Sequence, residues 1–211
     1  MLRVCEIFKS IQGESTHAGK VCSFVRLTGC NLHCSYCDTV YARTEGEEQS
    51  VEQIVREVQT HRTKLVEITG GEPLLQAETP LLCRRFLDLG LTVLVETNGS
   101  LDISAVPPPV VRIVDVKCPS SGHAGSFLQK NISLLASLDE CKFVLSDKDD
   151  FFWALDVVRK ENLHEIATVI FSPNMKLLPP KDLVEWILEE NAPVRLGVQL
   201  HKIIWGDLRG V

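Results

Sequence analysis

Three cysteines, Cys30, Cys34 and Cys37, follow one another in the pattern C-x3-C-x2-C. Three thiolates can hold a four-iron, four-sulfur cluster while one iron keeps an open coordination position. A cluster that only carries electrons usually has four protein ligands, whereas an open iron can bind a small molecule directly. The spacing therefore predicts a [4Fe-4S] centre that takes part in chemistry.

Two commoner kinds of site contain part of this pattern. The pair Cys34 and Cys37 alone would also suit half of a zinc site or a dithiol redox pair. A zinc site needs further ligands, but the other five cysteines are scattered singly and only His33 lies close in sequence. A dithiol redox pair has no use for Cys30. The cysteine run by itself leaves both alternatives open.

A second motif, Thr69-Gly70-Gly71-Glu72-Pro73, lies between an apolar run at 65–68 and a helical pattern over about 78–89. This context predicts a strand, a tight turn and a helix. Glycines let a backbone approach a ligand closely, and the peptide groups of such a turn can bind an ammonium group. The segment resembles the GGEP motif of radical S-adenosylmethionine (SAM) enzymes, which implies contact with the amino group of the methionine moiety.

Further motifs near both chain ends narrow the resemblance. They are Ser10-Ile11-Gln12-Gly13-Glu14-Ser15, Arg26, Cys37-Asp38-Thr39 and the tail from His201 to Val211. Together they resemble the 7-carboxy-7-deazaguanine synthase family over nearly the whole chain. The resemblance implies contraction of the ring of 6-carboxy-5,6,7,8-tetrahydropterin with loss of ammonia, a step towards deazaguanine nucleosides such as queuosine.

The resemblance also implies three bound groups. These are a [4Fe-4S] cluster on the three clustered cysteines, SAM on the open iron, and Mg²⁺ held by Thr39 against the substrate. The implied SAM contacts are Tyr36, Cys37, Asp38, Gly71, Glu72, Glu96, Asn98, Cys118, Pro119, Ser120, Ser172, Pro173 and Asn174. For the segments 118–120 and 172–174, plain Ser/Pro turns are an alternative.

Substrate contacts are inferred from resemblance together with chemistry. The implied residues are Ile11, Gln12, Gly13, Glu14, Arg26, Thr69, His201 and Val211. An amide and a carboxylate, as in Gln12 and Glu14, suit the donor and acceptor edge of a pterin. Arg26 can fork onto the substrate carboxylate, although an ordinary ion pair is its alternative role. The terminal carboxylate of Val211 is expected beside the pterin.

Composition sets the class of protein. A chain of 211 residues that is 45% hydrophobic and 24% charged suits one domain, residues 1–211. Without a signal peptide or an apolar run of membrane length, and with cysteines in ligand spacing, we expect a cytoplasmic enzyme. The net charge of -6 argues against nucleic acid as a partner. The resemblance implies a homodimer and an electron donor such as flavodoxin or ferredoxin.

Short runs rich in Val, Ile and Leu predict a parallel sheet buried on both faces. The predicted strands are 23–28, 64–69, 91–96, 110–115, 142–145, 167–171 and 194–200, and the predicted helices are 50–60, 78–89, 127–137, 149–161 and 180–190. The acidic run at 45–48 is expected to be a solvated loop. We predict an incomplete, TIM-like α/β barrel of the radical SAM type with trimmed crossover helices, and a site at the carboxyl ends of its strands.

Other functions share some of these motifs. An activase that places a radical on a partner protein would keep the cysteine run and the glycine turn, but would not need the pterin-type motifs. A tRNA-modifying radical enzyme would need basic surface. A non-enzymatic iron–sulfur electron carrier would have no use for a SAM-binding turn. Formation of 5′-deoxyadenosine and activity on the free pterin distinguish these possibilities.

Overall fold

The computed structural model, which describes residues 1–211, is built on one nine-stranded sheet with the order β3-β1-β2-β4-β5-β6-β7-β8-β9. The strands are β1 (Leu2–Ile11), β2 (Val21–Leu27), β3 (Glu47–Gln49), β4 (Leu65–Gly70), β5 (Thr92–Thr97), β6 (Val111–Asp115), β7 (Glu140–Leu145), β8 (Thr168–Pro173) and β9 (Arg195–Leu196). The α-helices are α1 (Val51–Thr60), α2 (Thr79–Asp88), α3 (Lys148–Lys160), α4 (Leu163–Ile166), α5 (Pro180–Glu189) and α6 (Leu200–Trp205).

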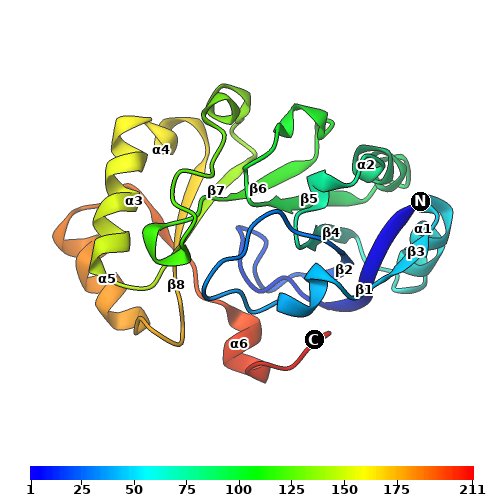
Figure 1. Ribbon diagram of the computed structural model, residues 1–211, viewed down its shortest axis with the longest axis horizontal. Helices are drawn as coiled ribbons and strands as arrows, with labels where there is room; N and C mark the ends of the chain where they lie inside the picture. Colours follow the sequence, from blue (N-terminus) through cyan, green and yellow to red (C-terminus); the bar gives the residue numbers. More distant parts are fainter.

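The sheet is parallel from β2 to β9, while β1 pairs antiparallel with both β2 and β3. The edge strands β3 and β9 do not pair with each other, so the sheet stays open. Figure 1 shows it as an arc with α1 to α5 on its outer side and α6 across the open side. The predicted incomplete α/β barrel is confirmed.

Helices cover the outer face of the sheet in two groups, each with its own apolar core. Beneath α1 and α2, the core includes Ile54, Phe86 and Leu27, which is fully buried. Beneath α3 to α5, Phe143 and Phe151 are fully buried. Helix α1 begins at a capping box in which Ser50 and Gln53 satisfy each other's backbone amides, as its sequence predicts.

Two crossovers lack α-helices, as the short chain predicts. Only 3₁₀ turns, at Ile103–Ala105, Pro119–Ser121 and Gln129–Leu134, connect β5 to β6 and β6 to β7. The prediction of an α-helix at 127–137 is therefore wrong, because the segment forms a 3₁₀ turn instead. The amide of Asn131, which is fully buried, donates to the carbonyl oxygens of Gly99 and Leu101 and holds this segment against the preceding crossover. Such side-chain bonds to backbone compete with a regular helix.

The remaining differences lie near the edges of the sheet. Strand β1 was not among the predicted strands, and part of the predicted acidic loop forms the edge strand β3 beside it. The predicted strand at 194–200 is mostly wrong. Its pairing ends at Leu196, and the chain then leaves the sheet because the amide of Leu200 bonds to the carbonyl oxygen of Gly13 at 2.9 Å. No helix is both long and apolar enough to cross a membrane.

Candidate active site

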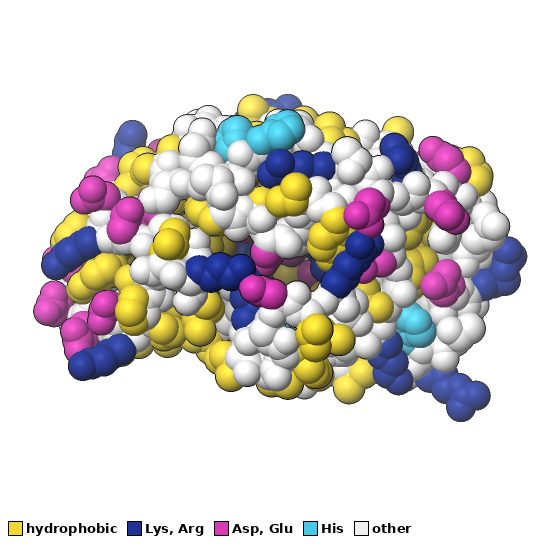
Figure 2. Space-filling model, turned by 60° about the horizontal axis from the view of Figure 1, so that its bottom comes forward, with side chains coloured by type: hydrophobic (Ala, Val, Ile, Leu, Met, Phe, Trp, Pro, Cys, Tyr) yellow, Lys and Arg dark blue, Asp and Glu magenta, His cyan; other side chains and the backbone are white.

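A cavity lies at the carboxyl ends of the parallel strands, the position expected for this architecture. Figure 2 looks toward the open side of the sheet, where a hollow is bordered by side chains of both charges. The predicted site residues that line the cavity are Ile11, Gln12, Gly13, Glu14, Arg26, Cys30, Cys34, Tyr36, Cys37, Asp38, Thr39, Thr69, Gly71, Glu96, Asn98, Asn174, His201 and Val211. The structure thus brings residues from both chain ends to one space.

The cysteine loop and the glycine turn are joined through their backbones. The amide of Gly71 donates to the carbonyl oxygen of Leu27 at 3.2 Å, and the amide of Glu72 donates to the carbonyl oxygen of Gly29 at 2.7 Å. A Cβ atom on Gly71 would overlap the carbonyl oxygen of Gly29 and approach Cys30 Cβ to 2.9 Å. Glycine is required at this position because the two loops lie so close together.

The three clustered cysteines suit an iron–sulfur cluster. All are free thiols that face the cavity, and the amide of Leu32 approaches Cys30 Sγ at 3.4 Å. Burial raises the pKa of Cys34, while the nearby Lys117 ammonium opposes that shift. No group of three His, Cys, Asp or Glu side chains surrounds a single point where one metal ion could bind. A cluster makes a different demand, since each thiolate binds a different iron.

The side chain of Glu72 stabilises the glycine turn and does not line the cavity. Its side chain is fully buried and accepts hydrogen bonds from Thr97 Oγ1 at 2.8 Å and from the amides of Asn98 and Leu74 at 2.7 and 2.9 Å. Burial raises the pKa of the Glu72 carboxyl despite these donors. This carboxyl therefore fastens the glycine turn to the end of β5, where Asn98 reaches the cavity wall.

Other predicted cofactor contacts also lie behind the cavity wall. The residues outside the lining are Glu72, Cys118, Pro119, Ser120, Ser172 and Pro173. The amide of Ser120 donates to Asp150 on α3, and its hydroxyl donates to Asp147, the N-cap residue of that helix. Ser172 Oγ is buried and has no hydrogen-bond partner. Only Asn174 of the 172–174 segment reaches the lining.

The segment after β1 docks against the C-terminal helix. Gln199 Nε2 donates to Glu14 Oε1 at 2.8 Å, and a Cβ atom on Gly13 would overlap His201 Nδ1. Gln12 is almost fully buried, and both ends of its amide are used within the chain. Its Oε1 accepts from the amide of Glu14 at 2.6 Å, and its Nε2 donates to Glu67 Oε2 at 2.7 Å.

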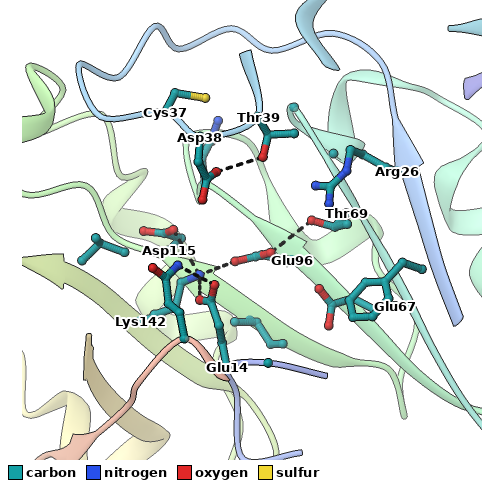
Figure 3. Close-up of a pocket in the computed structure, with 18 of the residues that line it drawn as sticks. Glu14, Arg26, Cys37, Asp38, Thr39, Glu67, Thr69, Glu96, Asp115 and Lys142 are labelled. Atoms are coloured by element: carbon teal, nitrogen blue, oxygen red, sulfur yellow. Dashed lines mark hydrogen bonds and ion pairs between the residues drawn. The ribbon is translucent and has the colours of Figure 1, made fainter. Parts of the chain in front are cut away.

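A single buried ammonium group gathers three carboxylates at the cavity wall (Figure 3). Lys142 on β7 bonds to Glu14 Oε2 at 2.7 Å, to Glu96, and to Asp115 Oδ2 at 3.4 Å. The pKa of the Glu14 carboxyl is lowered to about 2, because the effect of the Lys142 ammonium outweighs the opposite effect of burial. The three carboxylates in turn raise the pKa of Lys142 well above its ordinary value, against the effect of burial. Asp115 lines the cavity, and its Oδ1 atom is buried without a hydrogen-bond partner.

Arg26 keeps part of its guanidinium free. Its Nε donates to Glu6 Oε1 at 2.7 Å, which is the ion pair considered as its alternative role. No hydrogen bond within the chain uses its two terminal nitrogens, and Arg26 lines the cavity. Thr69, its register partner on β4, donates to Glu96 Oε2 at 3.0 Å. The arrangement leaves two nitrogen donors for an anion.

The C-terminal segment is tied to both the cysteine loop and β1. Lys202 Nζ lies 2.6 Å from Asp38 Oδ2, and together with Thr39 it lowers the pKa of Asp38 to about 2 although burial acts in the other direction. Arg209 bonds to Glu6 and Glu45 at 2.9 and 2.7 Å. These contacts fix the tail that brings Val211 to the cavity.

Sequence reasoning missed several polar residues of the cavity. They are Arg43, Glu67, Asp115, Lys117, Lys142, Gln199 and Lys202. The available signal was a charged residue inside an otherwise apolar strand, as in Glu67 between Val66 and Ile68. Such residues are rarely buried without a partner or a function.

Comparisons with known proteins agree with the geometry. Residues 24–115 match the model of the radical SAM superfamily. A 7-carboxy-7-deazaguanine synthase from Koribacter versatilis is 44% identical, over 97% of this chain and 97% of the relative. Another from Chlorobaculum tepidum is 41% identical, over 100% of this chain and 97% of the relative.

Solved structures show the same fold at lower identity. The crystal structure of QueE from Escherichia coli has a TM-score of 0.78 and 20% identity, and the match covers 95% of this chain and 94% of that one. Archaeal TYW1 has a TM-score of 0.59 and 14% identity, with 81% of this chain and 72% of that one covered.

Proposed function

Because the chain belongs to the 7-carboxy-7-deazaguanine synthase family of the radical SAM superfamily, we infer that it converts 6-carboxy-5,6,7,8-tetrahydropterin into 7-carboxy-7-deazaguanine. The reaction contracts the pterin ring and releases ammonia. It requires a [4Fe-4S] cluster and SAM, and the enzyme is a carbon–nitrogen lyase of deazapurine biosynthesis.

One observation carries this inference most directly. The cysteine loop, the glycine turn and both chain ends line a single cavity, and the two loops are joined by backbone hydrogen bonds. An activase or an electron carrier would have no evident need for the N-terminal and C-terminal segments at that place. Their docking through Gln199, Glu14 and Gly13 supports a small-molecule site beside the cofactor.

Residues of the cavity divide into two groups by chemistry. Cys30, Cys34 and Cys37 supply the soft thiolate donors that an iron–sulfur cluster requires, and Gly71 lets the turn proposed to bind SAM lie against the cysteine loop. When bound and reduced, cluster and SAM supply the radical that takes a hydrogen atom from the substrate. The unpartnered Asp115 Oδ1 is a ready acceptor for a donor group of a bound molecule.

The second group holds the substrate. The free terminal nitrogens of Arg26 suit the pterin carboxylate bidentately. Thr39, whose hydroxyl is 2.9 Å from Asp38 Oδ1, offers an oxygen ligand for Mg²⁺ beside that carboxylate. His201 and Val211 lie on the C-terminal side of the site. The cavity then keeps the substrate in register for hydrogen abstraction.

The domain organisation, location, oligomeric state and electron donor of the enzyme belong to the same proposal. We expect a single radical SAM domain over residues 1–211, cytoplasmic and homodimeric, reduced by flavodoxin or ferredoxin. Exposed apolar side chains of the C-terminal region, Ile203, Ile204 and Leu208, support burial against a second subunit.

The test is turnover of the free pterin. The protein, reconstituted anaerobically with iron and sulfide, is given SAM, a reductant and the carboxylated pterin. We expect 7-carboxy-7-deazaguanine, ammonia and 5′-deoxyadenosine, and none of them from a Cys34→Ala control. Formation of 5′-deoxyadenosine without any product from the pterin would favour the activase alternative. Absence of both would favour an electron carrier.

A further inference from the structure

Glu67 lies inside the open barrel on a strand that is otherwise apolar. Side chains alternate along β4, so Leu65, Glu67 and Thr69 share the inner face. Leu65 belongs to an inner apolar cluster, and Thr69 lies beside Glu96. Glu67 is 2% exposed and lines the cavity between these two levels. Figure 3 shows its carboxyl group directed into the space that Glu14 and Glu96 also face.

The immediate neighbours of Glu67 do not support a negative charge. Its register partners on the two adjacent strands are Phe24 and Leu94, both buried. Its hydrogen-bond donor is a neutral amide, Gln12 Nε2, at 2.7 Å from Oε2. A buried carboxylate normally needs a cation, whereas a neutral carboxylic acid can be satisfied by neutral partners.

No ion pair joins Glu67 to the cations that line the cavity, Arg26, Arg43, Lys117, Lys142 and Lys202. Lys142 is bonded to Glu14, Glu96 and Asp115, and its charge is more than balanced by theirs. Arg26, on the adjacent strand, pairs with Glu6 through Nε, and its register partner on β4 is Thr69 rather than Glu67. Burial and the negative charge of Glu96 raise the pKa of Glu67 to about 8, against the smaller lowering by Gln12 and Lys142.

We propose that Glu67 is a neutral carboxylic acid that recognises the substrate. It donates a hydrogen bond to an acceptor on the heterocycle of the substrate, either a ring nitrogen or a carbonyl oxygen. Since Gln12 occupies Oε2, the proton is placed on Oε1. Gln12 thereby becomes a positioning residue: its amide links Glu67 to the backbone of Glu14 and fixes the orientation of both. This inference rests on the proposed function, because the ligand is the pterin of that reaction.

Glu67→Gln is the informative variant, because glutamine keeps an acceptor for Gln12 and a neutral donor for the ligand but cannot ionise. Binding of the carboxylated pterin is measured with the reconstituted, SAM-loaded protein between pH 6.5 and 9.5. At pH 7 the variant should bind within about threefold of wild type. At pH 9.5 the wild type should bind at least about tenfold more weakly than the variant, since a group of pKa about 8 is then almost wholly ionised.

The comparison between the two proteins cancels any titration of the pterin itself. Glu140→Gln is the matched control: Glu140 is a buried carboxyl whose pKa burial also raises, but it lies outside the cavity. This control should keep the wild-type pH profile. A large loss of affinity in folded Glu67→Gln at pH 7 would overturn the proposal and make Glu67 an anionic acceptor. Parallel pH profiles for variant and wild type would overturn it as well, because binding would then not depend on the charge state of Glu67.

A ligand-free measurement separates this inference from the proposed function. The carbonyl stretch of a protonated carboxyl should be present in the infrared spectrum of wild type at pH 7 and lost in Glu67→Gln but not in Glu57→Gln, an exposed control. Absence of that band would overturn the proposal whether or not the pterin binds. If the band is present but neither wild type nor Glu67→Gln binds the pterin, the proposed function is wrong, and so is the proposed contact between Glu67 and the substrate.

Discussion

The ammonium group of Lys142 lies 2.7 Å from Glu14 Oε2, and this contact joins β7 to the segment after β1 across 128 positions of the chain. The Lys142 side chain is 5% exposed and also meets Glu96 and Asp115. One side chain therefore holds together three strands and the N-terminal part of the proposed substrate site. Its loss would leave carboxylates buried without a countercharge.

Replacement of Lys142 by Met tests that role. The variant should lose about 3–5 kcal/mol of unfolding free energy, because removing one partner of a buried ion pair leaves the others uncompensated. Urea unfolding at pH 7 measures this loss. Lys181→Met is the control, since Lys181 forms only an exposed pair with Glu185 on α5 and should change stability by less than about 0.5 kcal/mol. Equal stabilities for the two variants would contradict a structural role for Lys142.

Loss of any clustered cysteine should abolish cluster loading. Cys30→Ala, Cys34→Ala and Cys37→Ala remove one of three thiolates that share the cavity. Cys83→Ala and Cys141→Ala should retain the cluster, because these thiols are buried in the two outer cores. Iron content and visible absorbance after anaerobic reconstitution give the answer. Normal iron loading in Cys34→Ala would refute the ligand assignment.

Turnover of the pterin should depend on magnesium through Thr39. Mg²⁺ should raise the rate, and Thr39→Val should weaken the response because valine has no oxygen ligand to offer. The rate is followed against added Mg²⁺ after chelation, with Thr16→Val as control, since Thr16 binds Glu140 outside the cavity. Undiminished activity in fully chelated protein would rule out a role for the metal.

The C-terminal tail should contribute to substrate affinity. Arg209→Ala removes the stacking of its guanidinium on Tyr41, 3.8 Å from the ring centroid, together with the pairs to Glu6 and Glu45. The tail that brings Val211 to the cavity is then released, and KM for the pterin should rise several-fold. A C-terminal tag should act in the same direction. Arg159→Ala, which affects only an exposed pair with Glu190, is the control; a KM equal to that control would show that the tail is not a substrate ligand.

Protonation of Glu67 also has a signature in stability. Its pKa of about 8 in the folded protein exceeds the ordinary value of 4.5, so the carboxyl takes up a proton on folding between these values. Unfolding free energy of wild type should therefore fall relative to Glu67→Gln as pH rises, by up to about 1.4 kcal/mol per pH unit, and the difference should level off above pH 8. Denaturant unfolding at pH 5, 6.5 and 8 measures it, and a difference that does not change with pH would mean that Glu67 is ionised in the folded protein.

Local pattern was sufficient for much of the architecture. The apolar runs predicted the parallel strands β2 and β4 to β8 to within a few residues, because a strand buried on both faces needs continuous Val, Ile and Leu. The pattern Ser50 to Gln53 predicted the start of α1 because a capping box is made within four residues. Patterns failed where distant contacts decided the structure, as at Asn131, whose bonds to Gly99 and Leu101 hold the 127–137 segment in a 3₁₀ turn.

The sequence by itself determined the chemistry of this protein, since the spacing of Cys30, Cys34 and Cys37 and the glycines before Glu72 are local properties. The tertiary structure decided which polar groups meet. Only the fold brings Lys142 to Glu14 and leaves Glu67 between Phe24 and Leu94. Charge state and hydrogen-bond partners depend on neighbours from other strands, and these become neighbours only when the sheet forms.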